Sequence, residues 1–142
     1  EHRIEIFSRQ TTQVAKDRNI TFIPVDSHLF NQSLIHCTGI ITGGGFETPA
    51  EAIHLGKKII SIPIRAQYEQ QCNAAALKQM GVMCLKSIDE SFPDHFEEWI
   101  NNKEVIRRDY SKSIPESMEY LFSGKEQMME AFVPSEDYDL ID

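Results

Sequence analysis

The chain has 142 residues, 41% of them hydrophobic and 25% charged, which is typical of one globular domain that buries a core. The formal net charge of -8, without a visible cluster of Lys and Arg, excludes non-specific nucleic-acid binding, because that binding needs many cations on one face. Cys37, Cys72 and Cys84 match no zinc motif and no membrane-length apolar stretch occurs, so the sequence predicts reduced thiols in a cytoplasmic protein.

Strands and helices are predicted to alternate along most of the chain. Predicted strands cover residues 3–8, 20–25, 39–42, 59–64 and 82–85, and predicted helices cover residues 27–35, 49–55, 67–80, 92–100 and 110–122. Gly56 and Gly81 are the expected stops of the second and third helices. The alternation predicts an α/β fold of βαβ units with a mostly parallel sheet.

A triple glycine follows the predicted strand 39–42. Gly43, Gly44 and Gly45 leave backbone N–H groups unshielded, and the next helix points the positive end of its dipole into the same space. The spacing fits neither the Walker A motif nor the dinucleotide motif G-x-G-x-x-G. The loop is therefore predicted to bind an anion, in a protein that is neither a Walker-type NTPase nor a typical dinucleotide binder.

Two roles are open for the residues that follow the loop. Thr48, Pro49 and Glu51 fit a capping box, in which Thr48 and Glu51 satisfy each other's backbone N–H groups at the start of the helix. Alternatively, the Glu51 carboxylate lies one turn behind a phosphate loop, where it accepts hydrogen bonds from ribose hydroxyls.

A second polar cluster follows the predicted strand 59–64 and therefore opens on the same edge of the sheet. Glu69, Gln70 and Asn73 offer carboxylate and amide groups, which suit sugar hydroxyls because a hydroxyl both donates and accepts. The alternative is a polar first turn of a helix that only contacts water. The neighbouring glycine loop favours the sugar site.

These two motifs in this order resemble the donor-binding half of GT-B glycosyltransferases. The run I-T-G-G-G-F-E-T-P-A-E-A-I-H-L-G-K-K-I-I-S-I-P-I, followed by E-Q-Q-C-N-A-A-A-L, is most similar to the MurG-like members of glycosyltransferase family 28. The likeness covers residues 20–85. It implies a Rossmann-like three-layer α/β/α domain over residues 1–102, followed by a helical segment and an acidic tail over residues 103–142.

The resemblance implies a nucleotide-sugar donor, a UDP-sugar, with no metal and no cofactor. The glycine loop would hold the diphosphate, Glu51 the ribose, and the Glu69 and Gln70 pair the sugar, with the nucleobase near residues 25–27. The residues assigned in this way to donor binding are Gly43, Gly44, Gly45, Phe46, Thr48, Glu51, Glu69, Gln70 and Asn73.

The resemblance also implies parts that this chain does not contain. The first residue is not Met, the family's first strand and its glycine loop would precede Arg3, and the acceptor domain that commonly supplies the catalytic base has no counterpart here. The expected partner is therefore an N-terminal acceptor domain of the same polypeptide or of a partner chain, and the piece alone is expected to be inactive. Relatives with lipid acceptors dock at the inner membrane face, although no basic amphipathic patch supports docking here.

Hexosyl transfer to an acceptor hydroxyl is the leading hypothesis, with the catalytic residues outside this chain. A UDP-sugar epimerase or hydrolase built on the same frame is the first alternative. A non-catalytic donor-binding subunit, which completes its site with a separate chain, is the second.

Overall fold

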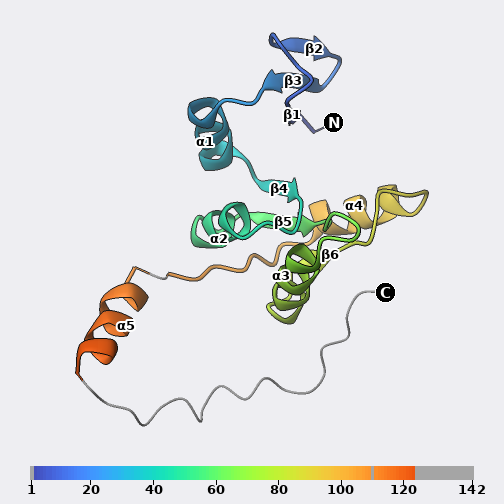
Figure 1. Cartoon of the computed structure of the whole chain (residues 1–142). Coiled ribbons are helices and arrows are strands. Elements are labelled where there is room, and N and C mark those ends of the chain that lie inside the picture. Colours follow the sequence, from blue (N-terminus) through green and yellow to red (C-terminus); the bar gives the residue numbers. More distant parts are fainter. Residues whose placement is uncertain (1, 110, 124–142) are drawn as a thin grey trace. The chain divides into compact units, whose positions relative to one another are not determined.

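The computed structural model describes residues 2–109 and 111–123, in which helices and strands alternate from the first helix, α1 (Ser27–His36), to the fourth, α4 (Phe92–Asn101) (Figure 1). The chain divides into two compact units, residues 1–38 and residues 39–142, called here the first and the second unit. Each unit has its own three-stranded sheet with helices, so the predicted α/β class is confirmed. Within the described residues, no helix combines the length and the hydropathy that crossing a bilayer requires.

The first unit contains strands β1 (Ile4–Ser8), β2 (Ala15–Asp17) and β3 (Ile20–Pro24) and helix α1 (Ser27–His36). Its sheet has the order β1-β3-β2, with β1 parallel to β3 and β2 antiparallel to β3. The parallel register runs from Ile4 opposite Ile20 to Ser8 opposite Pro24. The carboxyl ends of β1 and β3 therefore meet at one edge of this sheet and their amino ends at the other.

Helix α1 packs on β1 through an aromatic pair. The Phe7 and Phe30 rings meet edge to face with centroids 5.3 Å apart, a favoured geometry that contributes about 1 kcal/mol beyond the buried area. The helix begins as predicted, because the Asp26 side chain accepts a hydrogen bond from the backbone N–H of Leu29 at 2.8 Å. Leu34 completes the buried face of the helix.

Strand β2 was not predicted. It comprises only Ala15, Lys16 and Asp17, all exposed, so it carries no alternation of apolar and polar residues from which a strand could be recognised. It forms instead because the two-residue turn at Arg18 and Asn19 folds it back onto β3. This makes the sheet of the first unit mixed rather than parallel.

The second unit contains strands β4 (Gly39–Thr42), β5 (Lys58–Ser61) and β6 (Met83–Cys84), all parallel in the order β4-β5-β6. Helices α2 (Glu47–His54) and α3 (Tyr68–Gln79) are the crossovers between these strands, and α4 (Phe92–Asn101) and α5 (Ser113–Phe122) follow. The buried hydrophobic core lies mainly on β5, α2 and α3. Its members are Ala52, Ile53, Ile59, Ile60, Ala74, Ala75, Leu77, Val82 and Trp99.

Helix α4 is anchored to the sheet at its C-terminal end. A Cβ atom at Gly39 would lie 2.6 Å from the Trp99 ring, so only glycine lets this buried ring pack against β4. The Lys58 ammonium donates to the backbone carbonyls of Trp99 and Ile100 at 3.2 and 2.8 Å. It thereby satisfies carbonyls in the last turn of the helix, where a cation is favoured.

Most predicted boundaries agree with the structure within a few residues. Gly56 and Gly81 have φ angles of 66° and 91°, as expected of residues that end helices. The strand expected to reach residue 64 ends at Ser61, where the chain enters a loop that contains Pro63. For the last helix, Tyr110 lies outside the described residues, as does the acidic tail beyond residue 123. The predicted domain boundary near residue 102 stays a prediction.

The predicted capping box at Thr48 and Glu51 is wrong. Helix α2 begins at Glu47, two residues before Pro49, and its N-cap residue Phe46 makes no side-chain capping bond. Thr48 therefore lies inside the first turn and cannot cap it. Pro49 is tolerated at the third helical position, because N–H groups in the first turn have no partner within the helix.

Candidate functional site

Two loops follow neighbouring parallel strands of the second unit and define one rim. Residues 43–46 connect β4 to α2, and residues 62–67 connect β5 to α3. The carboxyl ends of β4 and β5 are in register, with Thr42 opposite Ser61, and the Ile62 N–H donates to the Thr42 carbonyl at 2.8 Å. Both loops therefore leave the same edge of the sheet, where ligands of open parallel sheets bind.

Two side chains of α3 hold the glycine loop through Gly44. The Gly44 N–H donates to the Gln70 side-chain oxygen at 3.1 Å, and the Asn73 side-chain amide donates to the Gly44 carbonyl at 3.0 Å. A Cβ atom at Gly44 would lie 2.4 Å from the Gln70 backbone oxygen, so a larger residue cannot occupy this position without moving α3. Gly44 is therefore the structural centre of the loop, fixed on both of its backbone groups.

Gln70 also joins the two loops of the rim. The same side-chain oxygen accepts a second hydrogen bond from the Ile64 N–H at 2.9 Å, and the Gln70 amide donates to the Gln67 side-chain oxygen at 2.6 Å. Both polar atoms of Gln70 are thus bonded within the protein. The arrangement fixes the spacing between the glycine loop and the loop before α3.

The neighbouring positions of the glycine loop face open space. Nothing lies within 4 Å of a Cβ atom built at Gly45, and the Phe46 side chain is 72% exposed. Among the residues that the structure describes, no protein group accepts a hydrogen bond from the N–H of Gly45 or Phe46. These donors lie where helix α2 begins, so an anion placed there meets both unpaired N–H groups and the positive end of a helix dipole.

The two carboxylates predicted for the donor lie on the helices that begin at this rim. Glu51 is exposed in the second turn of α2, and Glu69 is exposed in the first turn of α3. Neither carboxylate forms an ion pair among the described residues. They are therefore available to polar hydroxyl groups, whereas Thr48 is half-buried in the first turn of α2.

Sequence reasoning missed Gln67, Ile64 and Tyr68. The bonds of Gln67 and Ile64 to Gln70 arise from the turn before α3, in which Ala66 has a φ of 65°. No short motif encodes that turn. Tyr68 is 72% exposed at the start of α3, and its hydrogen bond with the Cys72 side chain raises the pKa of the phenol above its ordinary value.

Cys72 and Cys84 are free thiols. Burial raises the pKa of the Cys84 thiol to about 11, and its sulfur donates to the Ala74 carbonyl at 3.2 Å. A thiol with such a pKa is almost entirely protonated at neutral pH, so Cys84 is a packing residue rather than a nucleophile.

The segment predicted near the nucleobase, residues 25–27, belongs to the first unit, whereas the glycine loop belongs to the second. Val25 is 60% exposed, and Asp26 and Ser27 begin α1. The role of this segment stays a prediction.

Comparison with known proteins gives one match. The model of glycosyl transferase family 1 matches residues 1–134. Searches among curated proteins and among solved structures found no match. The matched region covers both units and both loops of the rim, and the α/β architecture with a parallel sheet is that of the Rossmann-like half of a GT-B enzyme. The chain therefore belongs to glycosyl transferase family 1.

Proposed function

We propose that this chain binds the nucleotide-sugar donor, a UDP-sugar, of a glycosyl transfer reaction. One observation carries the proposal: the Gly45 and Phe46 N–H groups have no partner in the described part of the chain and lie at the start of α2, in a loop that Gln70 and Asn73 hold from α3. Fixed N–H donors at a helix N-terminus suit a diphosphate. The family is one of glycosyl transfer, in which a nucleoside diphosphate is a natural leaving group.

The diphosphate is placed over Gly43, Gly45 and Phe46 in this proposal. As the bond to the sugar breaks, negative charge grows on the departing oxygen, and preorganised N–H groups stabilise that charge without having to reorient. The loop needs no metal to do this. The base that activates the acceptor hydroxyl is assigned to a separate acceptor domain, in the same polypeptide or in a partner chain.

The sugar and the ribose are assigned to the two exposed carboxylates. Glu69 lies in the first turn of α3 and accepts hydrogen bonds from sugar hydroxyls, and Glu51 reaches the ribose from the second turn of α2. Uridine is proposed as the nucleoside because the E-Q-Q-C-N-A run is similar to that of MurG-like transferases that use UDP-sugars.

Gln70 receives a more specific role than sequence reasoning gave it. Its amide group is bonded to Gly44, Ile64 and Gln67, so it positions the loop. A contact with the sugar requires its N–H bond to Gln67 to be exchanged for a bond to a hydroxyl. Gln70 is thus proposed to couple the geometry of the phosphate loop to the presence of a sugar.

Calorimetric titration with UDP, several UDP-sugars, ATP and NAD tests the proposal. We expect UDP and at least one UDP-sugar to bind at least about tenfold more tightly than ATP and NAD, since the difference of one or two hydrogen bonds gives such a factor. Gln70→Met should weaken UDP-sugar binding about tenfold by the same reasoning, whereas Gln79→Met, at the exposed end of the same helix, should not. Equal affinity for all four nucleotides would refute the proposal.

Incubation with the donor alone separates transfer from the alternatives. Because the base is assigned outside the chain, we expect this protein to leave a bound UDP-sugar unchanged. Formation of an epimer or of free UDP without an acceptor would instead favour an epimerase or a hydrolase.

A further inference from the structure

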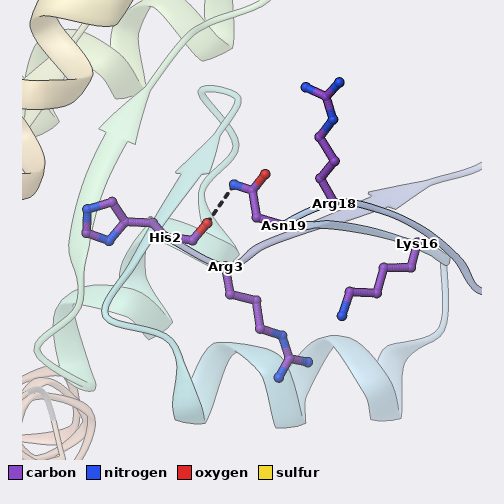
Figure 2. Close-up of a pocket in the computed structure, with 5 residues that line it drawn as sticks. All are labelled: His2, Arg3, Lys16, Arg18 and Asn19. Carbon is purple, nitrogen blue, oxygen red and sulfur yellow. Dashed lines mark hydrogen bonds between the residues drawn. The ribbon is translucent and has the colours of Figure 1, made fainter.

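A basic hollow lies on the first unit. It has a volume of about 390 Å³ and is lined by His2, Arg3, Lys16, Arg18 and Asn19 (Figure 2). In the sequence these cations are separated by up to fifteen positions, which is why no basic cluster was predicted. The fold brings them together, because the start of β1 and the turn between β2 and β3 meet at one end of the sheet.

Asn19 builds the floor of the hollow. Its carbonyl accepts from the Ile4 N–H at 2.9 Å, and its side-chain amide donates to the His2 carbonyl at 2.8 Å, a bond drawn in Figure 2. These two bonds join the residues before β1 to the turn before β3. The cations therefore extend from a backbone that is hydrogen-bonded on both sides.

The positive charges of the hollow are incompletely balanced. Arg3 pairs with Glu5, whereas Lys16 and Arg18 form no ion pair with any residue that the structure describes. Figure 2 shows Arg3 and Lys16 extending to one side of the backbone and Arg18 to the other. A cluster of exposed cations repels itself, so an anion bound among them gains from every member.

The turn holds an arginine in a conformation that favours glycine. Arg18 has a φ of 51°, and with Asp17 opposite Ile20 it occupies the first position of a two-residue hairpin loop, where glycine is usual. An arginine there carries backbone strain, which is observed most often at functional positions. Strain and uncompensated charge thus coincide at one residue.

The hollow lies at one edge of the sheet of the first unit. His2 and Arg3 precede β1, and Arg18 and Asn19 precede β3, so the hollow lies at the amino ends of these parallel strands. Ligands of open parallel sheets bind beyond the carboxyl ends of the strands. An anion in this hollow would therefore lie at the opposite edge of this sheet from the one at which such ligands bind.

We propose that the hollow binds a phosphate-bearing anion between Arg3 and Lys16, which extend to the same side of the backbone, with the exposed Arg18 side chain turning toward it. The guanidinium fork matches two phosphate oxygens, and lysine adds a point charge. The five lining residues include no Phe, Tyr or Trp ring on which a nucleobase could stack, and the chain's net charge of -8 opposes a nucleic-acid strand. The chemistry fits a free diphosphate or the phosphate headgroup of a lipid.

Titration of the ¹⁵N-labelled chain with inorganic diphosphate tests the proposal by amide signals. We expect saturable shifts at residues 16–20 that are fitted separately from any shifts at residues 43–46. Arg18→Gln should weaken the binding at residues 16–20 about tenfold, because it removes a charge-assisted contact. The matched control Arg9→Gln removes the same charge at the opposite end of β1 and should leave this affinity unchanged.

Arg18→Gly distinguishes a binding residue from a structural one. Glycine adopts the observed φ without strain, so this variant should keep or raise the melting temperature while it loses diphosphate binding. Shifts at residues 16–20 that do not saturate, or equal affinities for Arg18→Gln and Arg9→Gln, would overturn the proposal. Shifts confined to residues 43–46 would overturn it as well, while leaving the donor site intact.

Vesicles identify the source of the phosphate. Co-sedimentation with phosphatidylglycerol vesicles, lost in Arg18→Gln and absent with phosphatidylcholine vesicles, would assign the hollow to an anionic lipid headgroup. Saturable diphosphate binding without co-sedimentation would assign it to a soluble ligand. Binding of neither diphosphate nor anionic vesicles would refute the site.

Discussion

The two units of this chain share an α/β design but present opposite chemistry to anions. The first unit has four Lys and Arg residues and four Asp and Glu residues, whereas residues 39–142 have ten and eighteen. Yet the glycine loop, for which we propose phosphate binding, lies in the acidic second unit. The cations of the first unit gather at the amino ends of its strands instead.

The two sites that we propose would hold phosphate in different ways. The glycine loop offers neutral backbone N–H groups fixed by Gln70 and Asn73, so its selectivity comes from geometry. The basic hollow offers exposed charged side chains, so the binding that we propose there should depend on charge and be less selective. The anion affinities of the glycine loop and of the basic hollow should therefore respond differently to substitution, salt and pH.

The largest expected effect is at Gly44. Gly44→Ala places a Cβ atom 2.4 Å from the Gln70 backbone oxygen, so it should cost about 1–3 kcal/mol of unfolding free energy and abolish donor binding. The matched variant Gly45→Ala meets no atom within 4 Å and should change stability by less than about 0.5 kcal/mol. Urea unfolding and calorimetry measure both quantities. Equal losses in the two variants would contradict the account of the loop.

The second effect concerns the carboxylates of the donor site. Glu51→Gln should weaken UDP-sugar binding about tenfold, because an amide accepts ribose hydroxyls less well than a carboxylate does. Glu47→Gln, an exposed glutamate on the first turn of the same helix, serves as the control and should leave the affinity nearly unchanged. An unaltered affinity in Glu51→Gln would remove this residue from the site.

Salt should separate the two sites. Raising NaCl from about 50 to 300 mM should weaken diphosphate binding at the basic hollow about fivefold, because exposed charges are screened. UDP-sugar binding at the glycine loop should weaken less than about twofold, since fixed N–H donors act at short range. Parallel titrations at several NaCl concentrations measure how steeply each affinity falls with salt. An equal salt dependence of the two affinities would show that charge contributes equally to binding at both sites.

The smallest expected effect is the response to alkaline pH in the second unit. The raised pKa of Cys84 favours its neutral form in the folded protein, so its stabilising contribution is present below the ordinary pKa of 9.0 and is lost as the pH rises towards about 11. Cys84→Ala removes this contribution. The stability difference between wild type and variant should therefore shrink between pH 9 and pH 11, which urea unfolding at several pH values measures.

Sequence reasoning reached much of this fold because hydrophobic periodicity and glycine stops are local signals. Gly56 and Gly81 end their helices as predicted, and the family match supports the glycosyl transfer class. The exposed strand β2 was missed because its three exposed residues carry no periodicity. The capping box at Thr48 failed because the loop becomes helical before that residue. In both cases the three-dimensional context overrode the local pattern.

In the candidate site, too, short sequence motifs could be predicted, whereas contacts between residues that are distant in the sequence could not. The glycine loop was visible in the sequence, whereas the bonds of Gln70 to Gly44 and Ile64 connect residues that are distant or lie in an irregular turn. The basic hollow was invisible because its residues come from separate segments. The specific donor, a UDP-sugar, stays a proposal.

The central claim is that the glycine loop of the second unit binds the diphosphate of a UDP-sugar. Its most direct test is a titration of the ¹⁵N-labelled chain with UDP and UDP-sugars, followed at the amide signals of Gly44, Gly45 and Phe46. The account predicts saturable shifts of these signals with UDP and with a UDP-sugar, and little change with NAD. Unshifted loop signals under conditions in which UDP binds elsewhere would contradict it.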